Sequence, residues 1–178
     1  MKPYLNLDLL AATTAIISTI SGGLRKRFTW LFSIFSCSVY IIIFYSKGMM
    51  YNVGVHLVYL PISIWGALTW GLKKQDDKTI RSLPPRVTKF IVAAIALTLT
   101  ASLIFATDQL HTLDKITSVL SSIALFLLSN HFLESWLIFF IADILYLKLF
   151  LTANFDYSYY KSMFYIVFAM YSFLTWRR

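Results

Sequence analysis

A carboxylate inside a long apolar run is the first feature of this sequence that points to chemistry. Asp143 lies about seven residues into the hydrophobic segment that begins at Ser135. An Asp near the middle of a membrane helix costs roughly 2.5–3.5 kcal/mol, so it is expected to face a protein interior or a wet cavity. The position leaves two interpretations open, a structural hydrogen bond between helices and a contact with a bound solute.

Glu134 and several aromatic residues accompany Asp143. Glu134 precedes the same segment, where a carboxylate also suits the positive end of a helix dipole, so capping and binding are both open for it. Aromatic rings with polar tips can stack on a planar ligand and hydrogen-bond it, and their faces attract cations, although plain helix packing is an alternative. The aromatic residues deep within apolar segments are Tyr40, Tyr59, Trp65, Tyr146 and Tyr165.

Four tryptophans lie instead at segment ends beside basic residues, which is typical of interfacial anchors. They are Trp30, Trp70, Trp136 and Trp176. Small polar residues form a further pattern, because Thr117, Ser118, Ser121 and Ser122 recur at helical spacing. Such a face either packs helices closely or lines a hydrated path, and the sequence does not separate the two.

The composition requires membrane helices to position these residues. The chain is 58% hydrophobic and 13% charged, whereas soluble domains have roughly a quarter of their residues charged. A span needs about 20 apolar residues. Seven segments are predicted: Leu7 to Gly22, Phe28 to Tyr45, Val53 to Leu72, Val87 to Ala106, Ile116 to Ser129, Ser135 to Leu151 and Tyr159 to Trp176.

Metal, cofactor and nucleic-acid chemistry are not expected. The chain has one cysteine, Cys37, and three histidines far apart, so neither a disulfide nor a common metal-ligand spacing can be built. The net charge of +8 is spread between apolar segments and forms no continuous basic stripe. A membrane-embedded enzyme would need grouped acid, base or metal residues, and only isolated carboxylates are visible.

The basic residues predict the orientation of the chain. Cytoplasmic loops carry an excess of Lys and Arg. One side has Arg25–Arg27, the Lys73 to Lys89 segment and Arg177–Arg178, while the other has Lys2, Lys47, Lys115 and Lys161. We therefore expect an external N-terminus and a cytoplasmic C-terminus.

An internal repeat divides the chain. At an offset of 106 residues (136 minus 30), five aromatic residues match in identity, one matches conservatively, and Asp8 falls on Asp114. The aromatic pairs are Trp30 and Trp136, Tyr40 and Tyr146, Tyr51 and Tyr157, Tyr59 and Tyr165, Trp65 and Tyr171, and Trp70 and Trp176. Two three-helix units joined by one extra span make parallel repeats, an arrangement typical of transporters that bind substrate at mid-membrane. The predicted units are residues 1–72, a linker and linker helix at 73–106, and residues 107–178.

The second repeat resembles a known family, the PnuC-type vitamin transporters. The stretch Leu133-Glu134-Ser135-Trp136, then Asp143 and Tyr146, is similar to the family's acidic-x-Trp and Asp-x-x-Tyr signature. Trp30, Tyr40, Gly48, Tyr59, Trp65 and Trp70 fit the first half of the pattern. The resemblance implies an all-α integral membrane fold of seven helices in a SWEET-like 3+1+3 plan, in the bacterial inner membrane. It also implies facilitated diffusion of a vitamin, trapping by cytoplasmic phosphorylation and, by analogy, a homotrimer.

Departures from the family pattern bear on the substrate. At four positions this chain differs from the pattern of the riboside transporters that it resembles. It has Leu125-Phe126 where they have Gln-Trp, Ser135 where they have Asn, and Phe139 where they have Trp. The amide and indole groups that are lost are of the kind that hydrogen-bond nicotinamide and its ribose. Their loss favours thiamine as the substrate, because thiamine is a cation suited to aromatic faces and a carboxylate; nicotinamide riboside is the alternative. A non-transporting membrane subunit is a more distant alternative. The predicted binding residues are Tyr59, Trp65, Phe126, Glu134, Trp136, Asp143 and Tyr146.

Overall fold

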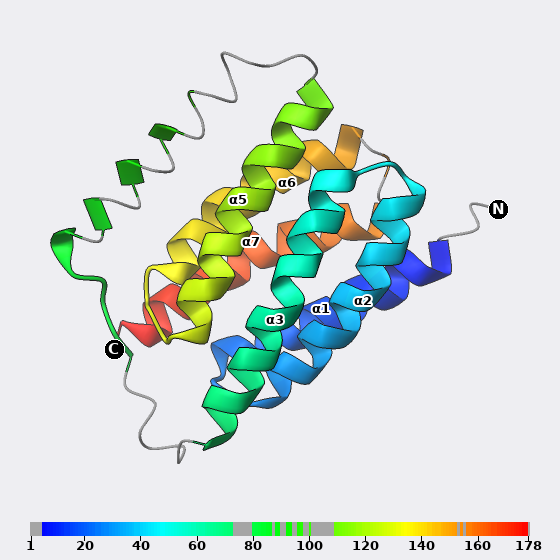
Figure 1. Ribbon diagram of the computed structural model, residues 1–178. Helices are drawn as coiled ribbons and strands as arrows, with labels where there is room; N and C mark the ends of the chain where they lie inside the picture. The colour runs from blue at the N-terminus through cyan, green and yellow to red at the C-terminus, as the bar shows by residue number, and fades with distance from the viewer. Residues whose placement is uncertain are drawn as a thin grey trace.

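Six helices make up the described fold. The computed structural model describes residues 5–72, 80–86, 88–89, 92–93, 96–97, 100, 109–152, 154 and 156–177. The helices are α1 (Leu5–Gly23), α2 (Phe28–Ser46), α3 (Met50–Leu72), α5 (Gln109–Ser129), α6 (Ser135–Thr152) and α7 (Asp156–Trp176), and Figure 1 shows them in one bundle. The predicted fourth span, from Val87 to Ala106, and most of the Lys73 to Lys89 linker lie outside the described residues.

The helices close into a ring. Neighbours along the chain pack together within α1–α3 and within α5–α7. Two further contacts complete the ring, because α3 packs on α5 and α7 packs on α1. The first and second three-helix bundles therefore meet along two helix pairs, and these pairs are counterparts at the repeat offset.

The turns recur at the same offset of 106 residues. The turn between α1 and α2 contains Arg25 with φ 57°, and the turn between α5 and α6 contains His131 with φ 63°. Gly48 (φ 69°) and Asn154 (φ 56°) likewise occupy the turns that follow α2 and α6. This left-handed backbone favours glycine and asparagine, which accounts for two of the four residue types.

Four helices, α1, α3, α5 and α7, begin earlier than the hydrophobic pattern predicts, and the difference is largest for α5. α5 starts at Gln109 instead of Ile116, because Asp114 is buried and bonded to the Asn52 amide and so does not end the helix. α7 starts at Asp156, so Lys161 is part of this helix and is 9% exposed. The sequence analysis used Lys161 only as a basic residue of the outer side, and its burial inside the bundle was not predicted.

The outer surface of the bundle is apolar. Large hydrophobic side chains are exposed on every described helix, for example Leu31, Val167 and Tyr45. Exposed apolar surface on this scale is typical of a lipid-facing protein, where helices satisfy their own backbone groups. Among the described helices, four are long and apolar enough to cross a membrane: Phe28–Ser46, Met50–Trp70, His111–Ser129 and Ser135–Thr152.

The four matched tryptophans form the core at one end of the bundle. Each is at most 3% exposed. The Trp30 and Trp70 rings meet edge to face with centroids 5.2 Å apart, and the Trp136 and Trp176 rings do the same at 5.5 Å. Their predicted role as lipid-interface anchors was wrong, because the rings pack on one another inside the protein.

A short segment of the linker lies against the second bundle. The Arg81 N–H donates to the His131 carbonyl at 3.0 Å, and the Leu133 N–H donates to the Arg81 carbonyl at 2.9 Å. The Leu83 N–H donates to Glu134 Oε1 at 3.0 Å. Glu134 therefore holds linker backbone, and its carboxylate interacts with a segment outside the six-helix ring.

Candidate functional site

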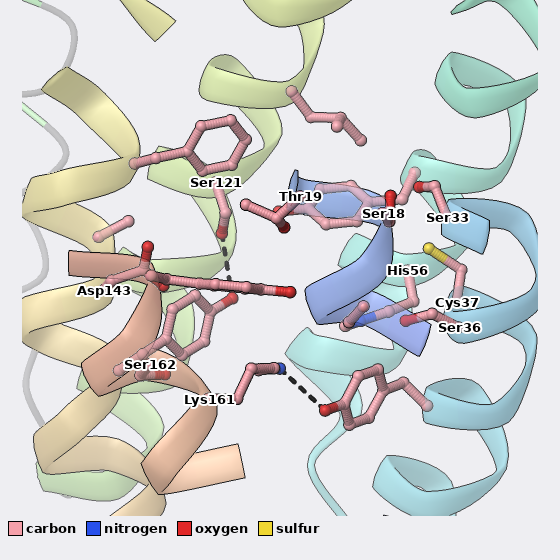
Figure 2. A pocket seen from close by; sticks show the side chains of 18 of the residues that line it. Ser18, Thr19, Ser33, Ser36, Cys37, His56, Ser121, Asp143, Lys161 and Ser162 are labelled. Atoms are coloured by element: carbon pink, nitrogen blue, oxygen red, sulfur yellow. Dashed lines mark hydrogen bonds between the residues drawn. The ribbon is translucent and has the colours of Figure 1, made fainter. Parts of the chain in front are cut away.

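A cavity lies inside the ring and is lined by all six described helices. The cavity and its opening together contain about 1020 Å³. Small-molecule sites are typically lined by apolar and aromatic side chains with a few polar groups, and the lining of this cavity has that character. Figure 2 shows that hydroxyl, thiol, imidazole and charged side chains point into it from opposite walls.

Two charged side chains line this cavity. Asp143 comes from α6 and Lys161 from α7, and both are more than nine-tenths buried. The Lys161 ammonium donates to the Tyr40 hydroxyl at 2.9 Å. His56 from α3 also lines the cavity, and its Nδ1 lies 2.8 Å from the Asn52 carbonyl oxygen. The site therefore combines both signs of charge with neutral hydrogen-bonding groups.

Stacked aromatic rings line the cavity near the start of α7. Tyr40 stacks on Phe44 with centroids 5.2 Å apart, and Tyr146 stacks on Phe150 at 5.0 Å. Phe44 and Phe150 lie parallel, 6.4 Å apart, and join the two pairs. The four residues are repeat counterparts, so each bundle contributes one Tyr–Phe pair.

Buried carboxylates support these tyrosines in both bundles. Ser158 donates to Asp8 Oδ1 at 2.6 Å and lies 3.1 Å from the Tyr40 hydroxyl. In the counterpart network, the Asn52 amide donates to Asp114, and the Tyr146 hydroxyl donates to Asn52 Oδ1 at 3.4 Å. Each network joins the two bundles across one helix pair, α1 with α7 or α3 with α5.

Indole rings line the opposite end of the cavity. The Trp70 N–H donates to the Ser129 carbonyl at 3.2 Å, and the Trp176 N–H donates to the Gly23 carbonyl at 2.9 Å. Trp30 and Trp136 line the cavity itself, and their N–H groups have no acceptor within the described part of the chain. A buried donor without an acceptor is costly, so a ligand acceptor would find two unpaired donors here.

The structure brings four of the seven predicted binding residues to the cavity. They are Tyr59, Trp136, Asp143 and Tyr146. Trp65 is 54% exposed and Phe126 is 56% exposed, and neither lines the cavity. Glu134 does not line the cavity, and its Oε1 accepts a hydrogen bond from the Leu83 N–H.

Several polar residues of the cavity were missed by the sequence reasoning, among them Lys161, His56 and Cys37. Lys161 was used only to orient the chain, and His56 and Cys37 were considered only for metal or disulfide chemistry. The repeat offset contained a usable signal, because Cys37 is the counterpart of Asp143 and Ser162 is the counterpart of His56. All four line the cavity.

Of the four positions that differ from the pattern of the riboside transporters, two face the cavity and two do not. Leu125 and Phe139 line the cavity, so these apolar side chains do face the site. Ser135 is buried and bonded to the Phe132 carbonyl, and Phe126 points outward. Only two of the four replaced positions can therefore alter recognition directly.

Comparison with known proteins gives concordant results. The family model described as nicotinamide mononucleotide transporter matches residues 5–178. A Neisseria mucosa protein named nicotinamide riboside transporter PnuC is 27% identical over 163 residues, which cover 84% of this chain. The chain spans 61% of that relative's length. A solved structure described as the vitamin B3 transporter PnuC has a TM-score of 0.81 at 24% identity, covering 99% of this chain and 82% of that one. The latter likeness establishes a shared fold.

Proposed function

This chain belongs to the nicotinamide mononucleotide transporter family, the PnuC-type vitamin transporters, and we propose that it carries nicotinamide riboside across a membrane. The observation that carries the proposal is the cavity enclosed by both bundles, with Asp143 on its wall. A ribose offers O–H donors to a carboxylate, and a flat nicotinamide ring suits walls built from Trp30, Trp136 and Tyr59.

The expected preference for thiamine has no support in the comparisons, which favour the alternative substrate. The name of the Neisseria mucosa relative specifies nicotinamide riboside.

The repeated contacts support a carrier with two gates. We infer two parallel three-helix repeats, with the connecting span in the segment between α3 and α5. One gate consists of the Asp8–Ser158 and Asp114–Asn52 bonds, and the other of the Trp176–Gly23 and Trp70–Ser129 bonds. All four bonds join one bundle to the other. Rocking of the bundles that breaks one set and keeps the other would expose the cavity to one side at a time.

The orientation and energetics follow from the same proposal. Arg25 and Lys26 lie beside the indole end, so that end faces the cytoplasm under the positive-inside rule, with the N-terminus outside. We infer facilitated diffusion across the bacterial inner membrane, made unidirectional by phosphorylation of the vitamin in the cytoplasm. Exposed rings such as Trp65 and Phe126 would then contact lipid or neighbouring copies in a trimer.

Binding to the purified protein tests the proposal. Nicotinamide riboside, thiamine and riboflavin are titrated separately in detergent while tryptophan fluorescence is followed, since Trp30 and Trp136 line the cavity. Saturable quenching by nicotinamide riboside, with none by thiamine, is expected. Saturable quenching by thiamine alone would overturn the proposal that nicotinamide riboside is the substrate. No response to any of the three, together with no rise in melting temperature, would favour a non-transporting subunit.

A further inference from the structure

Asp143 and Lys161 place opposite charges in the same half of the cavity. Of the described residues that line it, these two are formally charged when histidine is neutral, and both belong to the second bundle. At the repeat offset, Asp143 corresponds to Cys37 and Lys161 corresponds to Val55. Both counterpart positions of the first bundle are therefore uncharged, so the anion and the cation occur as a pair in one repeat and are replaced as a pair in the other.

Lys161 has a partner across the bundle interface and donors to spare. Its ammonium donates to the Tyr40 hydroxyl at 2.9 Å and lies 4.3 Å from the centroid of the same ring. The Tyr40 hydroxyl lies 3.1 Å from Ser158 Oγ, which in turn donates to Asp8 at 2.6 Å. An ammonium has three N–H donors, and among the described residues the Tyr40 hydroxyl is its hydrogen-bond acceptor. Two donors therefore remain for a second partner.

Asp143 lacks a comparable contact. Its side chain is 6% exposed, and its carboxylate makes no hydrogen bond and no ion pair within 4.0 Å with another described residue. Among those residues, Lys161 is the cation whose charge acts on this carboxylate. Figure 2 shows both side chains at the same cavity. A buried carboxylate without a counter-charge is costly, so Asp143 needs a cation whenever the cavity is closed.

A carrier that performs facilitated diffusion closes its gates in two situations. With solute bound, the positively charged ring of nicotinamide riboside supplies the counter-charge for Asp143. On the return step the cavity closes without solute, and this charge is missing. Net uptake requires the return step, because each carrier must go back empty before it takes the next solute. Exchange of one solute molecule for another does not require it.

We propose that Lys161 is a built-in counter-cation that compensates Asp143 while the carrier returns without solute. This inference rests on the proposed function and concerns how the same site is reset. While solute is bound, the solute cation compensates Asp143 and Lys161 keeps its contact with Tyr40. Lysine suits both states, because its compact ammonium is carried on a flexible four-carbon stem. Lys161 is thus a positioning residue for the return step.

Two fluxes through the full chain in liposomes test this role. Net uptake of labelled nicotinamide riboside is measured into liposomes that contain no solute. Exchange is measured into liposomes loaded with saturating unlabelled nicotinamide riboside. Equal potassium on both sides, with valinomycin, prevents a membrane potential from building up. The readout is the initial rate of net uptake divided by that of exchange, so differences in the amount of folded protein cancel.

K161M removes the cation and keeps an unbranched stem. Exchange is expected to stay within about threefold of wild type, whereas net uptake falls about tenfold or more, because an unpaired buried carboxylate opposes the return step. K161R should keep most of the wild-type ratio, since the cation remains. K148M removes an exposed lysine from α6 and should keep the full ratio.

The double variant D143N/K161M tests whether Asp143 is the group that needs the cation. Removing the carboxylate removes the charge to be compensated, so the ratio of net uptake to exchange is expected to return to the wild-type value. D143N alone should also keep this ratio. Both variants are measured at about tenfold higher solute concentration, which offsets their weaker binding.

Each failure has a distinct meaning. Equal losses of both fluxes in K161M, or an unchanged ratio, would overturn the role of Lys161 and leave the proposed function intact. A ratio that stays low in D143N/K161M would overturn the link to Asp143. Exchange without net uptake in the wild-type protein would overturn the return step on which the inference depends. The loss of both fluxes in the wild-type protein would overturn the proposed function, and this inference with it.

Discussion

At the scale of single residues, the account depends on which acidic side chain faces the cavity. Asp143 lines it, whereas Glu134 accepts a hydrogen bond from linker backbone. We predict that D143N lowers the affinity for nicotinamide riboside by about tenfold or more, or ~1.4 kcal/mol, since a charged hydrogen-bond acceptor is lost. E134Q keeps a carbonyl oxygen for Leu83 and should change affinity by less than about twofold. Equal losses in both variants, measured by titration, would mean that the site extends to Glu134.

The sequence predicted part of this site for physical reasons. Asp143 stands out because a carboxylate in an apolar membrane segment is costly unless it faces the protein interior or a wet cavity, where it can bind a partner. Trp65 and Phe126 do not line the cavity, and the sequence could not indicate this because cavity-facing and lipid-facing aromatic residues look alike when no hydrophobic drive separates them. Lys161 was missed because a lysine near the start of a span can extend its ammonium to the membrane surface. Its burial among Tyr40, Phe150 and Tyr165 is a tertiary property that a one-dimensional pattern does not contain.

At the scale of the helices, close packing of α3 on α2 fixes the position of Trp30. A Cβ added at Gly66 would overlap the Trp30 ring, whereas a Cβ at Gly54 of the same helix meets nothing within 4 Å. We predict that G66A destabilises the protein by about 1–3 kcal/mol through overpacking. G54A should cause no loss, because Ala favours a helix over Gly. Thermal unfolding in detergent measures both, and equal stability of G66A and wild type would show that Trp30 can move aside.

Helix positions were more predictable than helix ends. Every described helix overlaps an apolar segment of the sequence. The start of α5 was misplaced by seven residues (116 minus 109) because polar residues that pair inside the bundle, such as Asp114 with Asn52, were taken to end a span. The predicted fourth span lies outside the described residues and stays a prediction.

At the scale of the whole molecule, the repeat predicts paired effects. W70F and W176F each remove an indole N–H bond between the bundles, to the Ser129 and Gly23 carbonyls. W30F and W136F remove the same atoms from rings whose N–H groups have no acceptor among the described residues. We predict that the first two variants lose about 1–3 kcal/mol more of unfolding free energy than the second two. Similar losses in all four would assign the stability to ring packing.

The offset of 106 residues could be recognised in the sequence because six aromatic pairs share one register. The contacts that these residues make could not be recognised from the sequence. The same offset relates the Asp8 and Asp114 networks, the two indole bonds and the left-handed turns at Arg25 and His131. These contacts join segments far apart in the chain, and only the folded ring brings them together.

Transport by reconstituted protein tests the central claim most directly. Purified protein in liposomes is given labelled nicotinamide riboside without any ion gradient, with excess unlabelled thiamine in a parallel sample and D143N as the binding-defective variant. The account predicts saturable uptake that stops at equal concentrations inside and outside, resists thiamine and is reduced in D143N. Uptake no faster than in protein-free liposomes, or competition by thiamine as strong as by unlabelled nicotinamide riboside, would contradict it.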